Sequence, residues 1–307
     1  MAVLQVPNVV NYLPPRHRVA DTQYHDLLRD IMSEGKTVRP IHGGEARMIA
    51  GAQMRFDMAN GFPLITERDL SGKLFYGALA EHIAFLHGAS TLEELRAMGV
   101  PDRWWGPWVT KEKCANFGLA EGSLGPASYG PVWTAFPMRD GGVFNQITAI
   151  VEQIRRAPFL RTHHITNFYP PEVIGPPGTR KVVVAPCHGD IYINVFPAEG
   201  ELTIQHVQRS ADLPVGAAFN LIQYAGFGMM LAKVLGYTFT ELVYHFIDVH
   251  IYEVQYPYVE EILAREPMPF PTVTLDRDTD ELMAFRPEDF ILTDYTSGPK
   301  MFIPTPI

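Results

Sequence analysis

Apolar residues recur with the period of a helix near the start of the chain and with the period of a strand soon afterwards. Tyr24, Leu27, Leu28 and Ile31 fall on one helical face, which predicts a helix over residues 21–33. The same patterns predict the other elements of the first half: a strand over 46–57, an apolar helix over 74–86, an irregular Trp-rich stretch over 101–137 and an amphipathic helix over 144–156.

The second half mixes strands and helices without a regular alternation, which predicts an α+β fold. In the predicted long apolar helix, Ala225, Gly226 and Gly228 leave room for other backbone to approach. No linker divides the chain, so we expect one catalytic domain, residues 19–307, after an N-terminal arm, residues 1–18. The predicted elements of this half are strands over 191–196 and 202–208, a helix over 219–235 and a strand over 243–252.

Composition excludes several classes of protein. The chain is 47% hydrophobic and 19% charged, which is typical of a globular protein, and its net charge of −9 argues against a general nucleic-acid binder. The first residues lack the pattern of a signal peptide, and no uncharged apolar stretch approaches the roughly 18 residues of a membrane span. With only two cysteines, Cys114 and Cys187, we expect a cytoplasmic protein with reduced thiols.

Cys187 is the first candidate for chemistry. It follows the apolar run Val182-Val183-Val184 and precedes His188, as a nucleophile at the end of a strand would. The alternative is a small buried apolar residue, which is what most free cysteines are.

The segment Gln208-Arg209-Ser210-Ala211-Asp212 places three polar side chains before the long apolar helix. Arg209 could hold a phosphate and lower the pKa of a nearby thiol. Asp212 could accept hydrogen bonds from a heterocycle, although Ser or Asp at this point is also typical of a helix cap.

Asn220 lies at the start of the same helix, where a buried amide must find hydrogen-bonding partners. Because an amide both donates and accepts, it could read a uracil edge, or it could bond only to backbone. Farther on, alternation places Asp248, His250 and Tyr252 on one face of a strand. These side chains could line a sugar-binding pocket or form a solvent-facing edge.

Together these residues resemble the thymidylate synthase family, which includes the pyrimidine hydroxymethylases. The resemblance covers nearly the whole chain, from Tyr24 to Ile307, and rests on the order and spacing of many short motifs rather than on one of them. The motifs are APCH at 185–188, QRSADLPVGAAFN at 208–220, DVHIY at 248–252, QMRF at 53–56, GFPL at 61–64, Glu81 in its helix, Trp105 and Trp108, LGP at 124–126, Tyr129-Gly130 and REP at 265–267.

The resemblance implies a large mixed sheet flanked by helices, a homodimer formed through the sheet, and 5,10-methylenetetrahydrofolate as co-substrate with no metal. Cys187 would add to C6 of a pyrimidine nucleoside monophosphate, and Glu81 and Tyr129 would move protons. It implies substrate contacts from Arg209, Ser210, Asn220, His250, Tyr252 and, reaching in from the partner subunit, Arg161. It implies folate contacts from Trp105, Trp108, Asp212, Gly216, Phe219 and the terminal Ile307. Asp212 would also take part in catalysis.

The chain also departs from the family pattern. An arginine that thymidylate synthases usually carry is Ile41 here, with Arg39 and Arg47 close enough to substitute, and the second of two tandem arginines is Thr162. Two further departures are Phe246-Ile247 in place of Gly-Gly and Leu213-Pro214-Val215-Gly216 in place of Val-Phe-Leu-Gly.

These departures favour hydroxymethylation of dUMP, in which water attacks the exocyclic methylene, over thymidylate synthesis, in which hydride reaches it. Asn220 favours uracil, because the cytosine hydroxymethylases of the family carry Asp there; a CMP or dCMP hydroxymethylase is the third possibility. A homologue that binds nucleotides without catalysis is disfavoured by the joint presence of Cys187, Glu81, Tyr129 and Asn220. A metal hydrolase is disfavoured because His163-His164 lacks the spacing of metal ligands.

Overall fold

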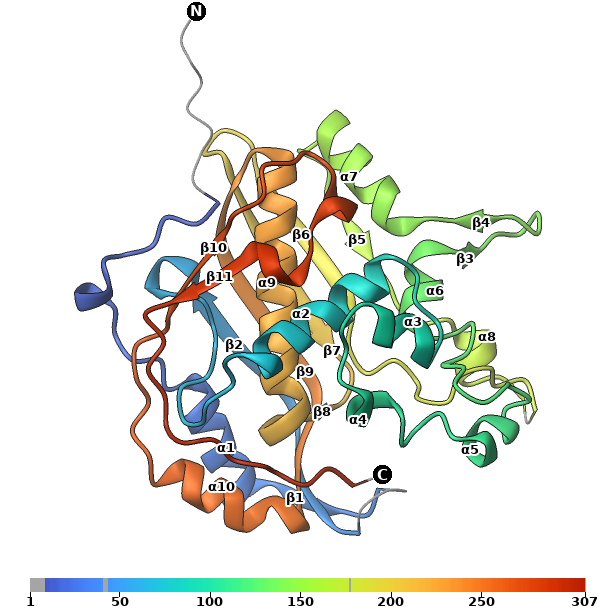
Figure 1. Cartoon of the computed structure of the whole chain (residues 1–307), viewed down its shortest axis with the longest axis horizontal. Helices are drawn as coiled ribbons and strands as arrows, with labels where there is room; N and C mark the ends of the chain where they lie inside the picture. Colours follow the sequence, from blue (N-terminus) through green and yellow to red (C-terminus); the bar gives the residue numbers. More distant parts are fainter. Residues whose placement is uncertain (1–8, 41–43, 177, 307) are drawn as a thin grey trace, which may run out of the picture.

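A seven-stranded mixed sheet forms the centre of the computed structural model, which describes residues 9–40, 44–176 and 178–306 (Figure 1). The strand order is β1, β2, β9, β7, β6, β5, and β8 pairs with the end of β9. β9 is antiparallel to β2 but parallel to β7, so the predicted mixed α+β architecture is confirmed. The strands are β1 (Lys36–Val38), β2 (Ala46–Asp57), β5 (His164–Ile165), β6 (Asp190–Phe196), β7 (Glu201–Gln208), β8 (Ala211–Asp212) and β9 (Thr238–Tyr252).

Helices cover one face of this sheet. α9 (Ala218–Leu235) packs along β7 and β9, and α2 (Lys73–Leu86) crosses α9 (Figure 1). α1 (Gln23–Glu34) packs against β2 and α10 (Tyr256–Leu263). The smaller elements are α3 (Leu92–Ala97), α4 (Asp102–Trp105), α5 (Lys111–Ala115), α6 (Tyr129–Thr134), α7 (Gln146–Arg156), α8 (Pro170–Val173), the π-helical turn η3 (Leu213–Ala217), and the strand pairs β3 (Phe136–Pro137) with β4 (Val143–Phe144) and β10 (Thr272–Leu275) with β11 (Phe290–Thr293).

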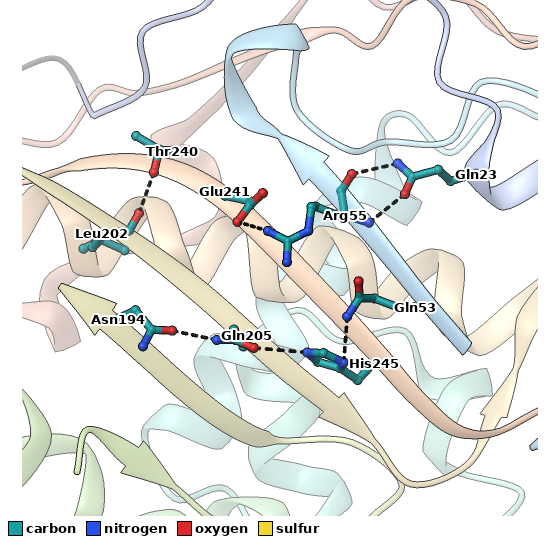
Figure 2. A network of polar contacts seen from close by, with 9 residues as sticks. All are labelled: Gln23, Gln53, Arg55, Asn194, Leu202, Gln205, Thr240, Glu241 and His245. Atoms are coloured by element: carbon teal, nitrogen blue, oxygen red, sulfur yellow. Dashed lines mark hydrogen bonds and ion pairs between the residues drawn. The ribbon is translucent and has the colours of Figure 1, made fainter. Parts of the chain in front are cut away.

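The other face of the sheet carries a network of polar side chains (Figure 2). Arg55 of β2 pairs with Glu241 of β9 at 2.6 Å, and Gln205 of β7 donates to Asn194 of β6 at 2.7 Å. His245 of β9 contacts Gln205 at 3.2 Å, which links the strands across the face. Because successive side chains of a strand point to opposite faces, the same strands present apolar residues to α9 and polar residues here.

α9 is buried on nearly every side. The helical segment Leu213–Leu235 is long and apolar enough to cross a membrane, with a mean hydropathy of 1.3, but 83% of its apolar window is buried inside the protein. The expectation that no apolar stretch approaches the length of a membrane span is therefore wrong. Lys233 and the buried amides of Asn220 and Gln223 do not lower the mean hydropathy of the segment enough. Its burial is that of a central core helix.

Side chains pack against the glycines of α9, whereas the sequence suggested that other backbone would approach them. A Cβ on Gly226 would lie 2.7 Å from a methyl group of Leu79, and one on Gly228 would lie 2.5 Å from the ring of Phe239. Both neighbours are fully buried or nearly so. The small residues therefore admit packing from α2 and β9.

Most predicted elements are present, and their ends differ for local reasons. The strand over 46–57 is β2, whereas the helix predicted over 144–156 begins at Gln146 because Asn145 caps it, accepting from the Thr148 amide at 2.9 Å. The last predicted strand extends back to Thr238. The stretch expected to be irregular contains α4, α5 and α6.

The described part of the expected N-terminal arm lies along the body of the protein. The carbonyl of Val9 accepts from the Phe239 amide at 2.8 Å, and the amide of Leu13 donates to Ala59 at 2.8 Å. Arg18 is buried and donates to the carbonyl of Phe270 at 3.0 Å. Residues 9–18 are thus held by hydrogen bonds to distant parts of the chain.

We predict that Gly228→Ala destabilises the protein although alanine is the better helix former. The methyl group would meet the buried ring of Phe239, and such overpacking costs about 1–3 kcal/mol, against a gain of about 1 kcal/mol in helix propensity. Gly226→Ala is the matched control, because it meets the flexible end of Leu79 and is expected to cost less. Urea unfolding of the two variants measures the difference; equal free energies of unfolding would contradict it.

Candidate active site

Two adjoining cavities collect nearly all the side chains singled out in the sequence. The larger, about 610 Å³, contains Cys187, and the smaller, about 260 Å³, contains Glu81 and Asn220. Trp108 and Val184 line both, so the two cavities lie side by side. The first cavity also exposes Arg209, Ser210, Asp212, His250 and Tyr252, and the second exposes Trp105, Tyr129, Gly216 and Phe219.

Cys187 lies in a loop and not at the end of a strand, as the sequence had suggested. Residues 182–184 are irregular, and the guanidinium of Arg180 donates to the carbonyls of Val182 at 3.1 Å and Val183 at 3.0 Å. The carbonyl of Cys187 accepts from the amide of Arg209 at 2.8 Å. Side-chain and backbone hydrogen bonds therefore fix this loop in place of a sheet ladder.

Two polar groups surround the half-buried thiol. Nη2 of Arg209 lies 3.6 Å from Sγ of Cys187, and the amide of Cys187 donates to the hydroxyl of Tyr129 at 2.8 Å. Burial raises the pKa of the Cys187 thiol, and the charge of Arg209 offsets part of that rise. The expected effect of Arg209 is thus present, but burial of the thiol outweighs it.

Glu81 is a buried carboxylate in α2 with a partner on each oxygen. Trp105 Nε1 donates to Oε1 and Gln223 Nε2 donates to Oε2, each at 2.5 Å. Burial raises the pKa of Glu81 to about 7, although both hydrogen bonds lower it. A carboxyl group with this pKa can both accept and return a proton at neutral pH.

Asn220 belongs to a row of buried amides rather than bonding to backbone. Its Nδ2 donates to Oε1 of Gln223 at 2.8 Å, and its Oδ1 accepts from Nε2 of Gln208 at 3.0 Å. Tyr244 donates in turn to Oε1 of Gln208. Sequence reasoning missed Gln223 and Tyr244; a glutamine three residues after Asn220 in an apolar helix was the available signal.

Asp248, His250 and Tyr252 face the larger cavity, as the alternation predicted. Asp248 accepts from the hydroxyl of Ser210 at 3.1 Å and lies 2.9 Å from Nδ1 of His250. Hydrogen bonding to His250 and Ser210 and the charges of His250 and Arg209 hold the pKa of Asp248 below its ordinary value, against the opposing effect of burial. Asp248 therefore orients two other residues of the predicted site, Ser210 and His250.

Asp212 acts as a helix cap and also faces the cavity. Its Oδ1 accepts from the amide of Val215 at the start of η3 at 3.2 Å, and its Oδ2 accepts from Gln255 at 2.9 Å. Burial raises the pKa of Asp212 to about 6. The two interpretations of this residue are compatible, because one carboxylate serves both.

The aromatic wall of the smaller cavity comes from α4 and the start of α9. Phe219 lies 4.9 Å from the ring of Trp104, and Trp105 is tied to Glu81 through its indole nitrogen. Thr305 and Pro306 of the C-terminal segment line the site, whereas Ile307 lies outside the described residues. This wall has the flat apolar character that suits a stacked heterocycle.

The arginines expected at a phosphate subsite are distributed unevenly. Arg39 lines the larger cavity while paired with Glu45 at 2.8 Å, and Arg47 stacks on Tyr256, 5.5 Å from its ring centre. Arg180, which the sequence did not single out, lines the same cavity as Arg209. Ile41 lies outside the described residues.

Arg161 is absent from both cavities. It lines a separate cavity of about 410 Å³ on the polar face of the sheet, with Tyr192, Gln205 and Ile247. A still larger cavity, about 890 Å³ near α3 and α4, contains none of the predicted site residues. Among the described residues no group of three or more His, Cys, Asp or Glu side chains is placed to hold a metal ion.

We predict that replacing Arg209 with methionine moves the pH profile of Cys187 alkylation by iodoacetamide to higher pH. The charge of Arg209 lowers the pKa of the thiol, and the thiolate is the reacting form. Mass spectrometry of the labelled peptide follows the reaction, and Arg55→Met on the far face of the sheet is the control. An unchanged profile would show that Arg209 does not act on the thiol.

The sequence matches the family model described as thymidylate synthase over residues 22–306. The match spans the sheet, the cysteine loop and the C-terminal segment that borders the cavities. The family's chemistry, one-carbon transfer to a pyrimidine nucleotide with methylenetetrahydrofolate as co-substrate, agrees with a thiol and a buried carboxyl group around one site. The chain belongs to the thymidylate synthase family.

Proposed function

We propose that this enzyme hydroxymethylates dUMP, using 5,10-methylenetetrahydrofolate and water to make 5-hydroxymethyl-dUMP. The observation that carries the proposal is Glu81, a carboxyl group with a pKa of about 7 that lines the smaller cavity beside Trp105 and Tyr129. A base of this strength suits activation of water at neutral pH.

The nucleotide lies with its ring between Cys187 and Asn220 in this proposal. Arg209 and Ser210 bind the phosphate, and His250 and Tyr252 bind the 3′-hydroxyl; all four line the cavity that contains the thiol. Asn220 donates to O4 and accepts from N3–H of uracil. These contacts hold C6 within reach of Sγ.

Covalent addition is the first chemical step. Sγ of Cys187 forms a bond to C6, and the electrons of the C5–C6 double bond make C5 a nucleophile toward the one-carbon unit. Tyr129, whose hydroxyl accepts from the Cys187 amide, assists removal of the C5 proton. After tetrahydrofolate leaves, an exocyclic methylene remains on C5 while C6 is still bound to sulfur.

Water then completes the reaction. Glu81 takes a proton from a water molecule, whose oxygen bonds to the exocyclic methylene as the ring electrons return and sulfur leaves C6. The folate is held by the aromatic side of the site, with Trp108, Gly216 and Phe219 as its walls and Asp212 near its ring.

Thymidylate synthesis is the second candidate. The flat wall formed by Trp104, Trp105 and Phe219 would hold the reduced pterin against the nucleotide, as hydride transfer requires. The same covalent steps then end with hydride on the methylene and release of dihydrofolate. A CMP or dCMP hydroxymethylase is the third candidate, and it requires Asn220 to accept a cytosine edge.

We assign the enzyme to the cytoplasm and take its partners to be the nucleotide, the folate and a second copy of the chain, with neither nucleic acid nor membrane. Both cysteines, Cys114 and Cys187, are free thiols, which suits a reducing compartment. The net charge of −9 disfavours binding to nucleic acid.

We predict that incubation with dUMP and methylenetetrahydrofolate yields 5-hydroxymethyl-dUMP and free tetrahydrofolate. Mass spectrometry identifies the nucleotide, and the absorbance of dihydrofolate reports the competing reaction. UMP, CMP and dCMP are tested in parallel, and Cys187→Ala, which removes the nucleophile, is the inactive control. Formation of dTMP with dihydrofolate would favour thymidylate synthesis, and turnover of cytosine nucleotides alone would contradict the assignment to uracil.

The position of Arg161 supports a homodimer formed through the polar face of the sheet. Arg161 is exposed on that face and lines neither active-site cavity of its own chain. The face also exposes Tyr192 and Ile247 to 45% and 56%. In a two-fold pairing of these faces, Arg161 of one subunit would reach the phosphate in the partner's site.

We predict that mixing two inactive variants, Arg161→Ala and Cys187→Ala, restores activity. If each site takes its arginine from the partner, each mixed dimer has one intact site and one inactive site. Random exchange of subunits makes about half of the dimers mixed, so about a quarter of wild-type activity should return. Sedimentation gives the oligomeric state. Activity that stays at the level of the separate variants would contradict the shared site, as would a monomer at micromolar concentration.

A further inference from the structure

Gln223 is a fully buried polar residue in the apolar helix α9, and it joins the two residues to which the proposed function gives different tasks. Its Nε2 donates to Glu81 at 2.5 Å, and its Oε1 accepts from Asn220 at 2.8 Å. The covalent mechanism uses Glu81 for protons and Asn220 for the base, and it leaves Gln223 without a task.

The direction of each hydrogen bond in this row is fixed from the Glu81 end. In its ionised form Glu81 only accepts, and in that form the amide nitrogen of Gln223 must face it, as the structure has it. The amide oxygen of Gln223 then faces Asn220, which must offer its nitrogen in return. One carboxylate thus sets the orientation of two successive amides.

The other end of the row fixes the same direction. Gln208 donates from Nε2 to the backbone carbonyl of Ser210 at 3.1 Å, and a carbonyl only accepts. The same nitrogen donates to Oδ1 of Asn220 at 3.0 Å, while Tyr244 donates to the oxygen of Gln208. Asn220 is therefore held the same way round by its neighbours on both sides.

This orientation has a consequence for the base. After its two internal bonds, Asn220 keeps one N–H and one oxygen lone pair, and it lines the cavity with Glu81 and Tyr129. Uracil offers an acceptor at O4 and a donor at N3, whereas cytosine offers a donor at N4 and an acceptor at N3. Pairing with cytosine at the same place requires the amide nitrogen and oxygen to exchange positions.

We propose that Gln223 is a positioning residue that sets the orientation of the Asn220 amide and thereby the preference of the enzyme for uracil over cytosine. The inference rests on the proposed function, in which Asn220 contacts the base. A reversed Asn220 would place its oxygen against the oxygen of Gln223 and its nitrogen against the nitrogen of Gln208. Because all three side chains are buried, water does not replace the lost bonds.

The test compares binding of dUMP and dCMP to the full-length protein by titration calorimetry, so that it does not depend on turnover. Gln223→Met keeps the length of the side chain and removes both hydrogen bonds. Gln208→Met removes the restraint on the other side and serves as a second variant if the first does not fold. Gln146→Met is the matched control, because Gln146 is a buried, hydrogen-bonded glutamine of α7 outside both cavities.

We expect wild type and Gln146→Met to prefer dUMP alike. The ratio of the dissociation constant for dCMP to that for dUMP should fall by about tenfold in each single variant, because one buried restraint on Asn220 is lost. In the double variant it should fall by about a hundredfold. A variant that only destabilises the protein would bind both nucleotides more weakly by the same factor and leave this ratio unchanged.

Two results would count against the inference in distinguishable ways. In the first, the preference for dUMP in Gln223→Met and in the double variant stays within about twofold of the wild-type preference. This result would overturn the role of Gln223 and leave the proposed function standing. A wild-type protein that binds neither nucleotide, or prefers dCMP, would overturn the proposed function and this inference with it.

Discussion

A continuous row of buried hydrogen bonds runs from α2 through the head of α9 to the end of β7 and on to the cysteine loop. It begins at Glu81, passes through Gln223, Asn220 and Gln208, and reaches the carbonyl of Ser210, whose amide donates to the carbonyl of Cys187 at 3.3 Å. Because Glu81, Gln223, Asn220 and Gln208 are all buried, breaking a bond between two of them leaves a donor or acceptor without water. The row therefore fixes three elements and the loop of Cys187 relative to one another.

Burial also determines the charge state of the site. It raises the pKa of Glu81 to about 7 and that of Asp212 to about 6, and it raises the pKa of the Cys187 thiol. Burial also lowers the pKa of His188, which follows Cys187 in the sequence, to about 3, so the imidazole ring is neutral at pH 7. The site thus holds carboxyl groups that exchange protons near neutral pH, as proton transfer to and from a pyrimidine ring requires.

The sequence predicted the elements well wherever one face of a helix or strand is buried, as in α1 and β2, because burial imposes a period. Polar residues inside apolar runs, which are costly unless they have partners, pointed to Asn220 and to the polar face of Asp248, His250 and Tyr252. The residues of the aromatic wall and Glu81 came only from the resemblance to the family. The sequence failed for residues 182–184, whose conformation is set by hydrogen bonds from Arg180 and not by a pattern. It likewise missed Gln223, because only the three-dimensional row shows that this amide joins Glu81 to Asn220.

The local field of the larger cavity explains how an acidic protein can select an anionic ligand. The whole chain carries a net charge of −9, yet Arg39, Arg180 and Arg209 all line this cavity. Burial and the charge of Arg209 lower the pKa of Arg180, which means that the two guanidinium groups repel each other. A phosphate between them would remove that repulsion and gain charge-assisted hydrogen bonds. The three arginines therefore support the proposal that the ligand is a nucleotide rather than a neutral nucleoside, because nearby charges around a confined space outweigh distant surface charge that salt screens.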